Sequence, residues 1–171
     1  MAHPRTETKR LMRRLHRPQR RLAFWLHDVE DPVNVGSIFR TGDALGVDRV
    51  HLSGITPRPP HKLITRVGRN KDRRVSWSAW EEAGPAIQDL RSEGWSVLAL
   101  EITPRASSYE SFDFPEASCL LLGHEDHGVP QKILELCTAQ IFIPMYGKGA
   151  SLNVATAGAV VAYHALHGVP G

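Results

Sequence analysis

The stretch Leu120-Leu-Leu-Gly-His-Glu-Asp-His-Gly128 is an apolar, strand-like run that breaks at Gly123 into a polar turn. In open sheets of parallel strands, ligands gather at the carboxyl ends of the strands. Gly123 has no side chain, so a ligand can approach its backbone closely. The stretch therefore predicts a strand that leads directly into a binding site.

Strand-like and helix-like segments alternate on both sides of this stretch. The predicted strands are residues 22–27, 50–52, 95–100, 119–122 and 141–143. The predicted helices are residues 34–45, 85–91, 130–136 and 152–166, several of them bounded by Gly or Pro. This alternation favours an α/β fold, with a mostly parallel sheet and helices on both of its faces.

Length and composition fit one domain with a basic arm. The chain has 171 residues, of which 42% are hydrophobic, and this is enough to bury a core. Its longest apolar stretch, residues 155–166, is shorter than the roughly 20 residues that span a bilayer. The N-terminus is basic and lacks the apolar segment of a secretory signal. We therefore expect a cytoplasmic protein, with residues 1–21 as the arm and residues 22–171 as the main domain.

Positive charge is concentrated in two segments. Residues 1–21 carry eight basic side chains and one acidic one, although the net charge of the whole chain is only +3. The second segment, residues 58–74, contains one acidic residue, Asp72, and seven basic ones: Arg58, Lys62, Arg66, Arg69, Lys71, Arg73 and Arg74. One such cluster could simply keep a surface solvated, but two favour a nucleic acid partner. The proline-rich residues 55–61 cannot be helical and are a candidate RNA-facing loop.

A second polar stretch, Asp31-Pro-Val-Asn-Val-Gly-Ser-Ile-Phe-Arg40, follows the first predicted strand. Asn34 can cap the helix that begins there, and Arg40 lies on that helix six residues later. This separation does not put the two side chains on one helix face, so a joint role needs Arg40 to reach back toward Asn34. A helix cap plus a surface arginine is the alternative interpretation.

A third stretch, Ile141-Phe-Ile-Pro-Met-Tyr-Gly-Lys-Gly-Ala-Ser-Leu-Asn-Val154, reads as a strand, a glycine-bearing loop and the start of the last helix. Ser151 and Asn153 open that helix, whose first backbone amides are unpaired. The stretch is not a phosphate-binding loop of the Gly-x-x-x-x-Gly-Lys-Ser/Thr kind, because no Ser or Thr follows Lys148.

A metal site is not predicted. The polar turn contains His124, Glu125, Asp126 and His127, but their order is not His-Glu-x-x-His and no further ligands cluster nearby. The two cysteines of the chain also lack metal-ligand or redox spacing.

Taken together, the three stretches resemble the motifs of one family in order and spacing. The matching residues are Asn34 followed by Arg40, Gly123-x-Glu125-x-x-Gly128, and Ile143-Pro-Met followed by Ser151-Leu-Asn153. The family is the TrmH-type RNA ribose 2′-O-methyltransferases of the SPOUT superfamily, and the resemblance covers about residues 22–167. It implies a C-terminal deep trefoil knot, which general rules of chain connection would not predict. It also implies S-adenosylmethionine as the cofactor and a homodimer with the active site at the interface.

The resemblance also implies roles for individual residues. The cofactor-binding residues would be Leu100, Gly123, Ile143 and Leu152. The catalytic group would be Arg40 with Asn34, Glu125, Ser151 and Asn153 around it. The basic clusters would then hold the RNA backbone, through residues such as Arg10, Arg13, Arg14, Arg66, Arg69 and Arg73.

Transfer RNA is favoured over ribosomal RNA as the substrate, because small members of this build often modify transfer RNA. Two alternatives remain open: a non-catalytic RNA-binding protein on the same scaffold, and a methyltransferase that modifies an RNA base. The presence of Asn34, Arg40, Glu125 and Asn153 argues against the first. The TrmH-type order of Asn34 and Arg40 argues against the second.

Overall fold

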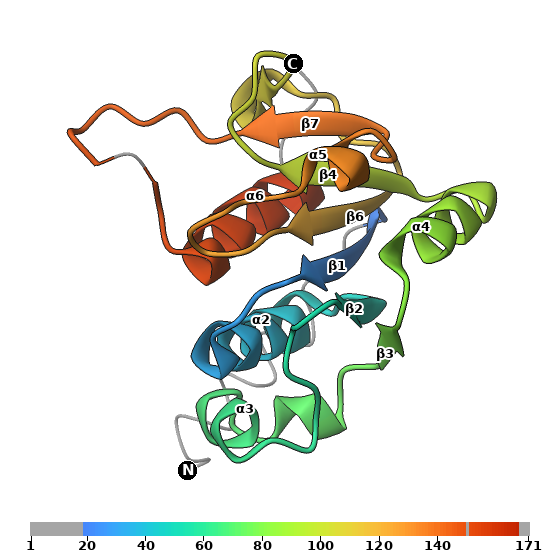
Figure 1. Cartoon of the computed structure of the whole chain (residues 1–171), viewed down its shortest axis with the longest axis vertical. Coiled ribbons are helices and arrows are strands. Elements are labelled where there is room, and N and C mark those ends of the chain that lie inside the picture. Colours follow the sequence, from blue (N-terminus) through green and yellow to red (C-terminus); the bar gives the residue numbers. More distant parts are fainter. Residues whose placement is uncertain (1–18, 150, 168–171) are drawn as a thin grey trace, which may run out of the picture.

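A computed structural model describes residues 19–149 and 151–167. Within these residues, seven strands form one sheet in the order β3-β2-β1-β6-β4-β7-β5, and every neighbouring pair is parallel (Figure 1). The strands are β1 (Arg21–His27), β2 (Arg49–Ser53), β3 (Trp77–Trp80), β4 (Ser96–Leu100), β5 (Ser107–Ser108), β6 (Ala117–Leu122) and β7 (Ala139–Phe142). The predicted parallel sheet is confirmed, and all of its loops after strand ends meet at one edge.

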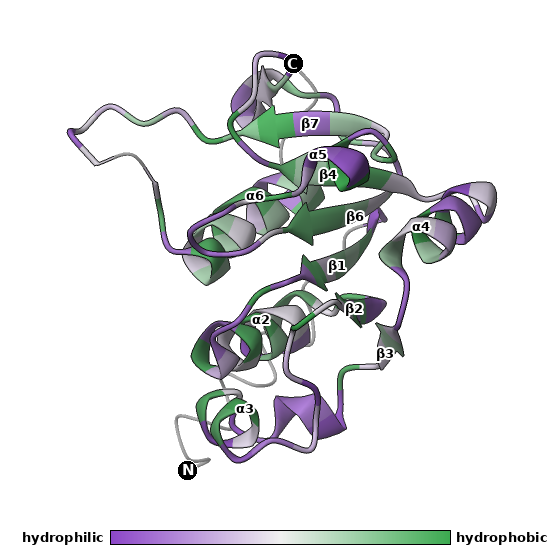
Figure 2. Ribbon diagram, viewed as in Figure 1, coloured by the Kyte–Doolittle hydropathy of each residue, from purple (hydrophilic) through white to green (hydrophobic). Residues whose placement is uncertain are grey.

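Helices cover both faces of the sheet, as predicted. They are α2 (Pro32–Leu45), α3 (Lys62–Val67), α4 (Ala83–Ser92), α5 (Gln131–Leu134) and α6 (Val154–His167). Side chains alternate along β1, so Phe24 joins a core with residues of α2, α3 and α6, whereas Trp25 joins a second core with α4 and α5. Figure 2 shows the central strands β1 and β6 as mainly hydrophobic, which is typical of strands buried on both faces.

The sequence patterns missed the elements at the edges of the fold. Strands β3 and β5 lie at the two edges of the sheet, and none of their residues is fully buried. Helix α3 has one buried residue, Ile64. Short elements that bury so little carry a weak periodic signal.

The predicted cap of α2 was wrong. The helix begins at Pro32, and Asp31 is its N-cap, whose side chain accepts from the backbone nitrogen of Val33 at 2.8 Å. The first position of a helix tolerates proline, because a backbone N–H at that position would have no partner within the helix. Asn34 therefore lies inside the first turn, with its side-chain amide available for other contacts.

Most of the basic arm, residues 1–18, lies outside the described residues. At the end of the arm, Arg20 donates to the backbone oxygen of Ala165 at 3.1 Å, and Arg21 forms an ion pair with Asp48. Arg21 also lies 4.6 Å from the ring centre of Trp95. Within the described residues, no helix combines the length and apolarity needed to cross a bilayer.

A buried histidine packs against two tryptophans in the second core. The ring of His51 stacks on Trp25 at 5.0 Å and on Trp80 at 6.1 Å, and its Nδ1 accepts from Trp80 Nε1 at 3.1 Å. Burial, helped by the nearby charge of Arg49, lowers the pKa of His51 to about 4. The imidazole is therefore neutral in the folded protein at neutral pH.

This neutral histidine predicts a loss of stability in mild acid. Between pH 6.5 and 4 the unfolded chain takes up a proton on His51 that the folded chain does not, so stability falls as the pH falls. From pH 7.5 to pH 5 the free energy of unfolding should drop by about 2 kcal/mol through this group. Urea titrations at several pH values would measure this drop, and His51→Gln should flatten the dependence. An unchanged slope in that variant would contradict the assignment.

Candidate active site

The three polar stretches meet at the carboxyl edge of the sheet. They are the start of α2 after β1, the turn at residues 123–128 after β6 (the 123–128 turn), and the segment before α6. A pocket of about 460 Å³ opens there, within the size range of small-molecule sites. Its lining includes Leu100, Gly123, Ile143 and Leu152 together with Glu125 and Ser151. All four of the proposed cofactor residues and two of the proposed catalytic residues therefore lie at one pocket.

A chain of hydrogen bonds joins the three stretches. Glu125 Oε1 accepts from Asn34 Nδ2 at 2.8 Å, and Asn34 Oδ1 accepts from Asn153 Nδ2 at 2.9 Å. Asn153 Oδ1 accepts in turn from the backbone nitrogens of Ala155 and Thr156, at 3.0 and 3.1 Å, and so caps α6. Residues that are 91 and 119 positions apart in sequence are thus joined by side-chain contacts.

Glu125 is held as an ionised acceptor. Its carboxylate also accepts from the backbone nitrogens of Glu30 at 3.0 Å and Asp31 at 3.2 Å. Partial burial alone would raise the pKa of Glu125, but the hydrogen bonds from Asn34 and from these backbone groups outweigh it, so the pKa lies below its ordinary value. A carboxylate with a lowered pKa is a weak base, which favours a positioning role over proton removal.

Two glycines of the 123–128 turn are required by close contacts within the protein. A Cβ on Gly123 would lie 2.5 Å from the carbonyl of Gly128, so this glycine lets the turn close on itself. Gly128 has φ +64°, and a Cβ there would lie 2.2 Å from Glu101 Oε2. The sequence predicted that a ligand could approach the backbone of Gly123 closely. In the structure, the backbone of Gly128 lies close to it.

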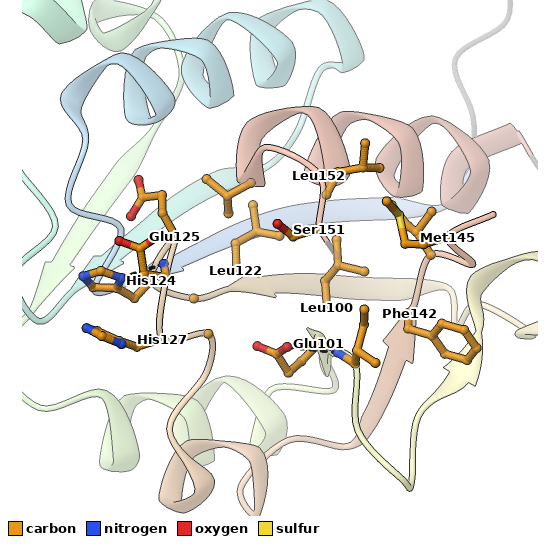
Figure 3. A pocket seen from close by; sticks show the side chains of 17 residues that line it. Leu100, Glu101, Leu122, His124, Glu125, His127, Phe142, Met145, Ser151 and Leu152 are labelled. Atoms are coloured by element: carbon orange, nitrogen blue, oxygen red, sulfur yellow. Dashed lines mark hydrogen bonds between the residues drawn. The ribbon is translucent and has the colours of Figure 1, made fainter. Parts of the chain in front are cut away.

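Glu101 was missed by the sequence analysis, although it lines the pocket. It follows β4 directly, and that position at a strand end is the signal that could have identified it. Figure 3 shows Glu125, His124 and His127 on one side of the pocket and Phe142 and Met145 on the other, with Glu101 between them. The pocket thus has a polar half and an apolar half.

Arg40 lies outside this pocket. It is exposed on α2 and lines a separate hollow with Val67 of α3 and Tyr163 of α6. Within the described part of one chain, Arg40 is therefore not brought together with Glu125 or Ser151. Its place on a different surface agrees with the expectation that it does not share a helix face with Asn34.

The predicted RNA-binding residues divide between two regions. Arg66, Arg69 and Arg73 are exposed on and after α3, which packs beside α2. Arg10, Arg13 and Arg14 lie outside the described residues. The second basic cluster is thus on the same side of the sheet as Arg40.

No metal cluster emerges in the described residues. Among residues 19–149 and 151–167, no group of three or more His, Cys, Asp or Glu side chains could hold a metal ion. His124 Nδ1 accepts from the backbone nitrogen of Asp126 at 3.0 Å, while its Nε2 lies 3.6 Å from a carboxylate oxygen of Glu30. These contacts account for both ring nitrogens of His124.

The sequence and the fold both match known RNA methyltransferases. Residues 21–163 match the SpoU rRNA Methylase family. The chain is 31% identical over 160 residues to a tRNA (guanosine(18)-2′-O)-methyltransferase of Escherichia coli, which covers 94% of this chain and 69% of that protein.

Two solved structures share the fold. An AdoMet-bound rRNA methyltransferase from Sinorhizobium meliloti has a TM-score of 0.80 at 27% identity, covering 90% of this chain and 59% of that one. A chain studied for 2-OH methylation of C/U34 on tRNA has a TM-score of 0.75 at 30% identity, covering 86% of this chain and 95% of that one. This chain thus spans less than two thirds of the Sinorhizobium protein. Because the family match extends over residues 21–163, which is most of the chain, the chain belongs to the SpoU rRNA methylase family.

Proposed function

We propose that this chain transfers the methyl group of S-adenosylmethionine to a ribose 2′-hydroxyl of structured RNA. The observation that carries the proposal is the hydrogen-bonded chain Glu125–Asn34–Asn153 beside the pocket at the carboxyl edge of the sheet. Two of the relatives described above are named for tRNA and one for rRNA. Transfer RNA is the favoured substrate, and RNA of either kind favours a cytoplasmic location.

The pocket suits S-adenosylmethionine. Its apolar half, which includes Leu100, Ile143 and Leu152, can enclose the adenosyl part, and its polar half can take the charged part. The bound cofactor supplies an electrophilic methyl group on a positively charged sulfur. Gly123 leaves a side-chain-free stretch of turn on the pocket wall.

Positioning is the main task of the residues around the pocket. Glu125, Asn34 and Asn153 hold three loops in fixed relation, so that a ribose hydroxyl can be presented in line with the methyl group. Ser151 lines the pocket and can donate to or accept from the substrate. A guanidinium carries a fixed positive charge in proteins, so the role of Arg40 is to stabilise the developing alkoxide and to hold a phosphate, while water or a phosphate oxygen takes the proton.

A homodimer would bring Arg40 to a site. Arg40 lies away from the pocket of its own chain, on a surface where α2 meets α6. On α6, the large apolar side chains of Val160 and Tyr163 are 39% and 50% exposed. A second copy packed on this surface would cover them and place its Arg40 beside the first copy's pocket.

The C-terminal segment would form the deep trefoil knot. Helix α6 packs against β1, β6 and α2. On α6, His164 contacts the rings of Tyr109 and Phe114, at 5.1 and 5.8 Å between ring centres. The segment that follows β5 thus lies against α6, and the threading of the chain is proposed on the family resemblance.

Product analysis separates the proposed reaction from its alternatives. Purified protein incubated with unmodified tRNA and S-adenosylmethionine should yield a 2′-O-methyl nucleoside, detected by nuclease digestion and mass spectrometry. A base-methylated product would identify the base methyltransferase alternative. RNA binding without any methylated product would favour the non-catalytic alternative.

Arg40→Ala should lower methyl transfer by about 10²-fold or more, because a donor to the developing alkoxide is lost. Binding of S-adenosylmethionine, measured by calorimetry, should stay nearly intact, since Arg40 lies outside the pocket of its own chain. Arg40→Lys keeps the charge but not the planar guanidinium, and is expected to fail as well. Equal loss of binding and turnover would argue against this role.

Mixing two inactive variants provides the control for a shared site. If Arg40 acts on the partner's pocket, Arg40→Ala mixed and refolded with Glu125→Ala forms mixed dimers that contain one intact site. Random pairing should then restore about a quarter of the wild-type activity. No recovery, despite dimers seen by light scattering, would place Arg40 in the site of its own chain.

The basic clusters should contribute salt-dependent RNA affinity. Replacing Arg66, Arg69 and Arg73 together by Ala should weaken tRNA binding and lower the slope of log K against log salt by about one per lost phosphate contact. Deletion of residues 1–17 should act in the same direction. Arg91→Ala removes one exposed basic side chain on α4, across the sheet, and as the control it should leave the slope nearly unchanged. A slope that changes equally in the control would overturn the assignment.

A further inference from the structure

The pocket is acidic, although the chain as a whole is basic. Its lining includes Glu101, Glu125 and Asp126 but, among the described residues, no Lys or Arg. The net charge of the chain is +3, and the basic cluster on and after α3 lies outside the pocket. A pocket of this kind repels phosphate groups and attracts a cation.

Of these three carboxylates, Glu101 is the one that is fixed in place and can still interact with a ligand. Glu125 is bound by Asn34 and by the backbone of the loop before α2, and Asp126 is exposed on the 123–128 turn. Glu101 is half-buried, and its oxygens accept from the backbone nitrogens of Val129 at 2.9 Å and Ile102 at 3.0 Å.

The contacts of Glu101 fix its position without neutralising its charge. Two hydrogen bonds use about half of the acceptor capacity of a carboxylate. Among the described residues, Glu101 forms no ion pair with a Lys, Arg or His. Gly128 provides the space beside it, since a Cβ there would lie 2.2 Å from its Oε2. The fold thus keeps a carboxylate without a basic partner on the pocket wall, between its polar and apolar halves.

We propose that Glu101 recognises the sulfonium charge of S-adenosylmethionine and distinguishes this cofactor from its neutral product. The inference rests on the proposed function. Glu101 lies between the apolar and polar halves of the pocket (Figure 3), and the sulfonium is the atom that joins the adenosyl and methionyl parts of the ligand. A sulfonium has no N–H or O–H, so the attraction is Coulombic and needs a charge, not only an acceptor.

The reaction itself removes this attraction. The methyl group passes from sulfur to the ribose oxygen, the hydroxyl proton leaves to water or a phosphate oxygen, and the sulfur keeps the electron pair of the broken bond. The resulting thioether is neutral, so Glu101 no longer holds it by charge. A carboxylate at this position therefore strengthens binding of the charged cofactor without strengthening binding of the neutral product, which favours product release.

Calorimetry on Glu101→Gln tests the proposal without reference to activity. Glutamine has nearly the same shape and keeps one oxygen to accept from the backbone nitrogen of Val129, but it has no charge and its NH2 group replaces the oxygen that accepts from Ile102. We expect S-adenosylmethionine to bind about tenfold more weakly, equivalent to ~1.4 kcal/mol. Sinefungin, which carries a protonated amine beside the position of the sulfur, should weaken similarly. S-adenosylhomocysteine, the neutral product, should change by less than about twofold.

Matched variants separate charge from structure. Glu101→Asp keeps the charge, so its ratio of cofactor affinity to product affinity should stay near that of the wild type, even if both affinities fall. This variant also tests the proposal if Glu101→Gln folds poorly. Asp126→Asn removes a charge from the same pocket and should change the ratio by less than about threefold. Equal weakening of all three ligands by Glu101→Gln, or equal effects of Glu101→Gln and Asp126→Asn, would overturn the proposal. Wild-type protein that binds none of the three ligands would instead refute the proposed function.

Discussion

An ionised carboxylate can only accept hydrogen bonds, and this one-way property of Glu125 orients the candidate site. Because Glu125 accepts, Asn34 turns its amide nitrogen toward it and its oxygen toward Asn153. Asn153 then donates with its nitrogen and caps α6 with its oxygen. The backbone amides at the start of α6 can only donate, so they impose the same direction on the chain from its other end. A neutral residue at position 125 would remove the acceptor for Asn34 and for the loop before α2, and would thus detach the 123–128 turn from the other two segments.

The packing of helices on both faces of the sheet explains why three side chains are enough to join the three loops. All seven strands in the described residues run in parallel, so the loops that follow β1, β4, β6 and β7 emerge at one edge. Cores on both faces, around Phe24 and Trp25, hold the strand ends in position. Rigid strand ends let polar side chains meet at hydrogen-bond distance without the entropic cost of ordering long flexible loops.

Local patterns in the sequence predicted the central elements and the three motif stretches, but not their tertiary partners. Strands β1 and β6 were identifiable because they are continuous apolar runs, whereas β3 bears only half-buried side chains. Asn34 was mistaken for a cap because a cap and an interior first-turn residue have similar local sequences, and Asp31 with Pro32 competes successfully for that position. The role of Glu101 depends on its contact with Gly128, 27 residues away, which no local pattern contains.

The distribution of charge fits the two proposed substrates, which are of opposite sign. RNA is a polyanion, and the exposed Arg66, Arg69 and Arg73 lie on the same side of the sheet as Arg40. The pocket that would take the cationic cofactor carries Glu101, Glu125 and Asp126. If both surfaces had the same sign, RNA phosphates would compete for the cofactor pocket, or the cofactor would be repelled from it. Acidic residues inside the pocket and basic residues outside it therefore sort the two ligands before either makes a specific contact, and this sorting needs no moving part.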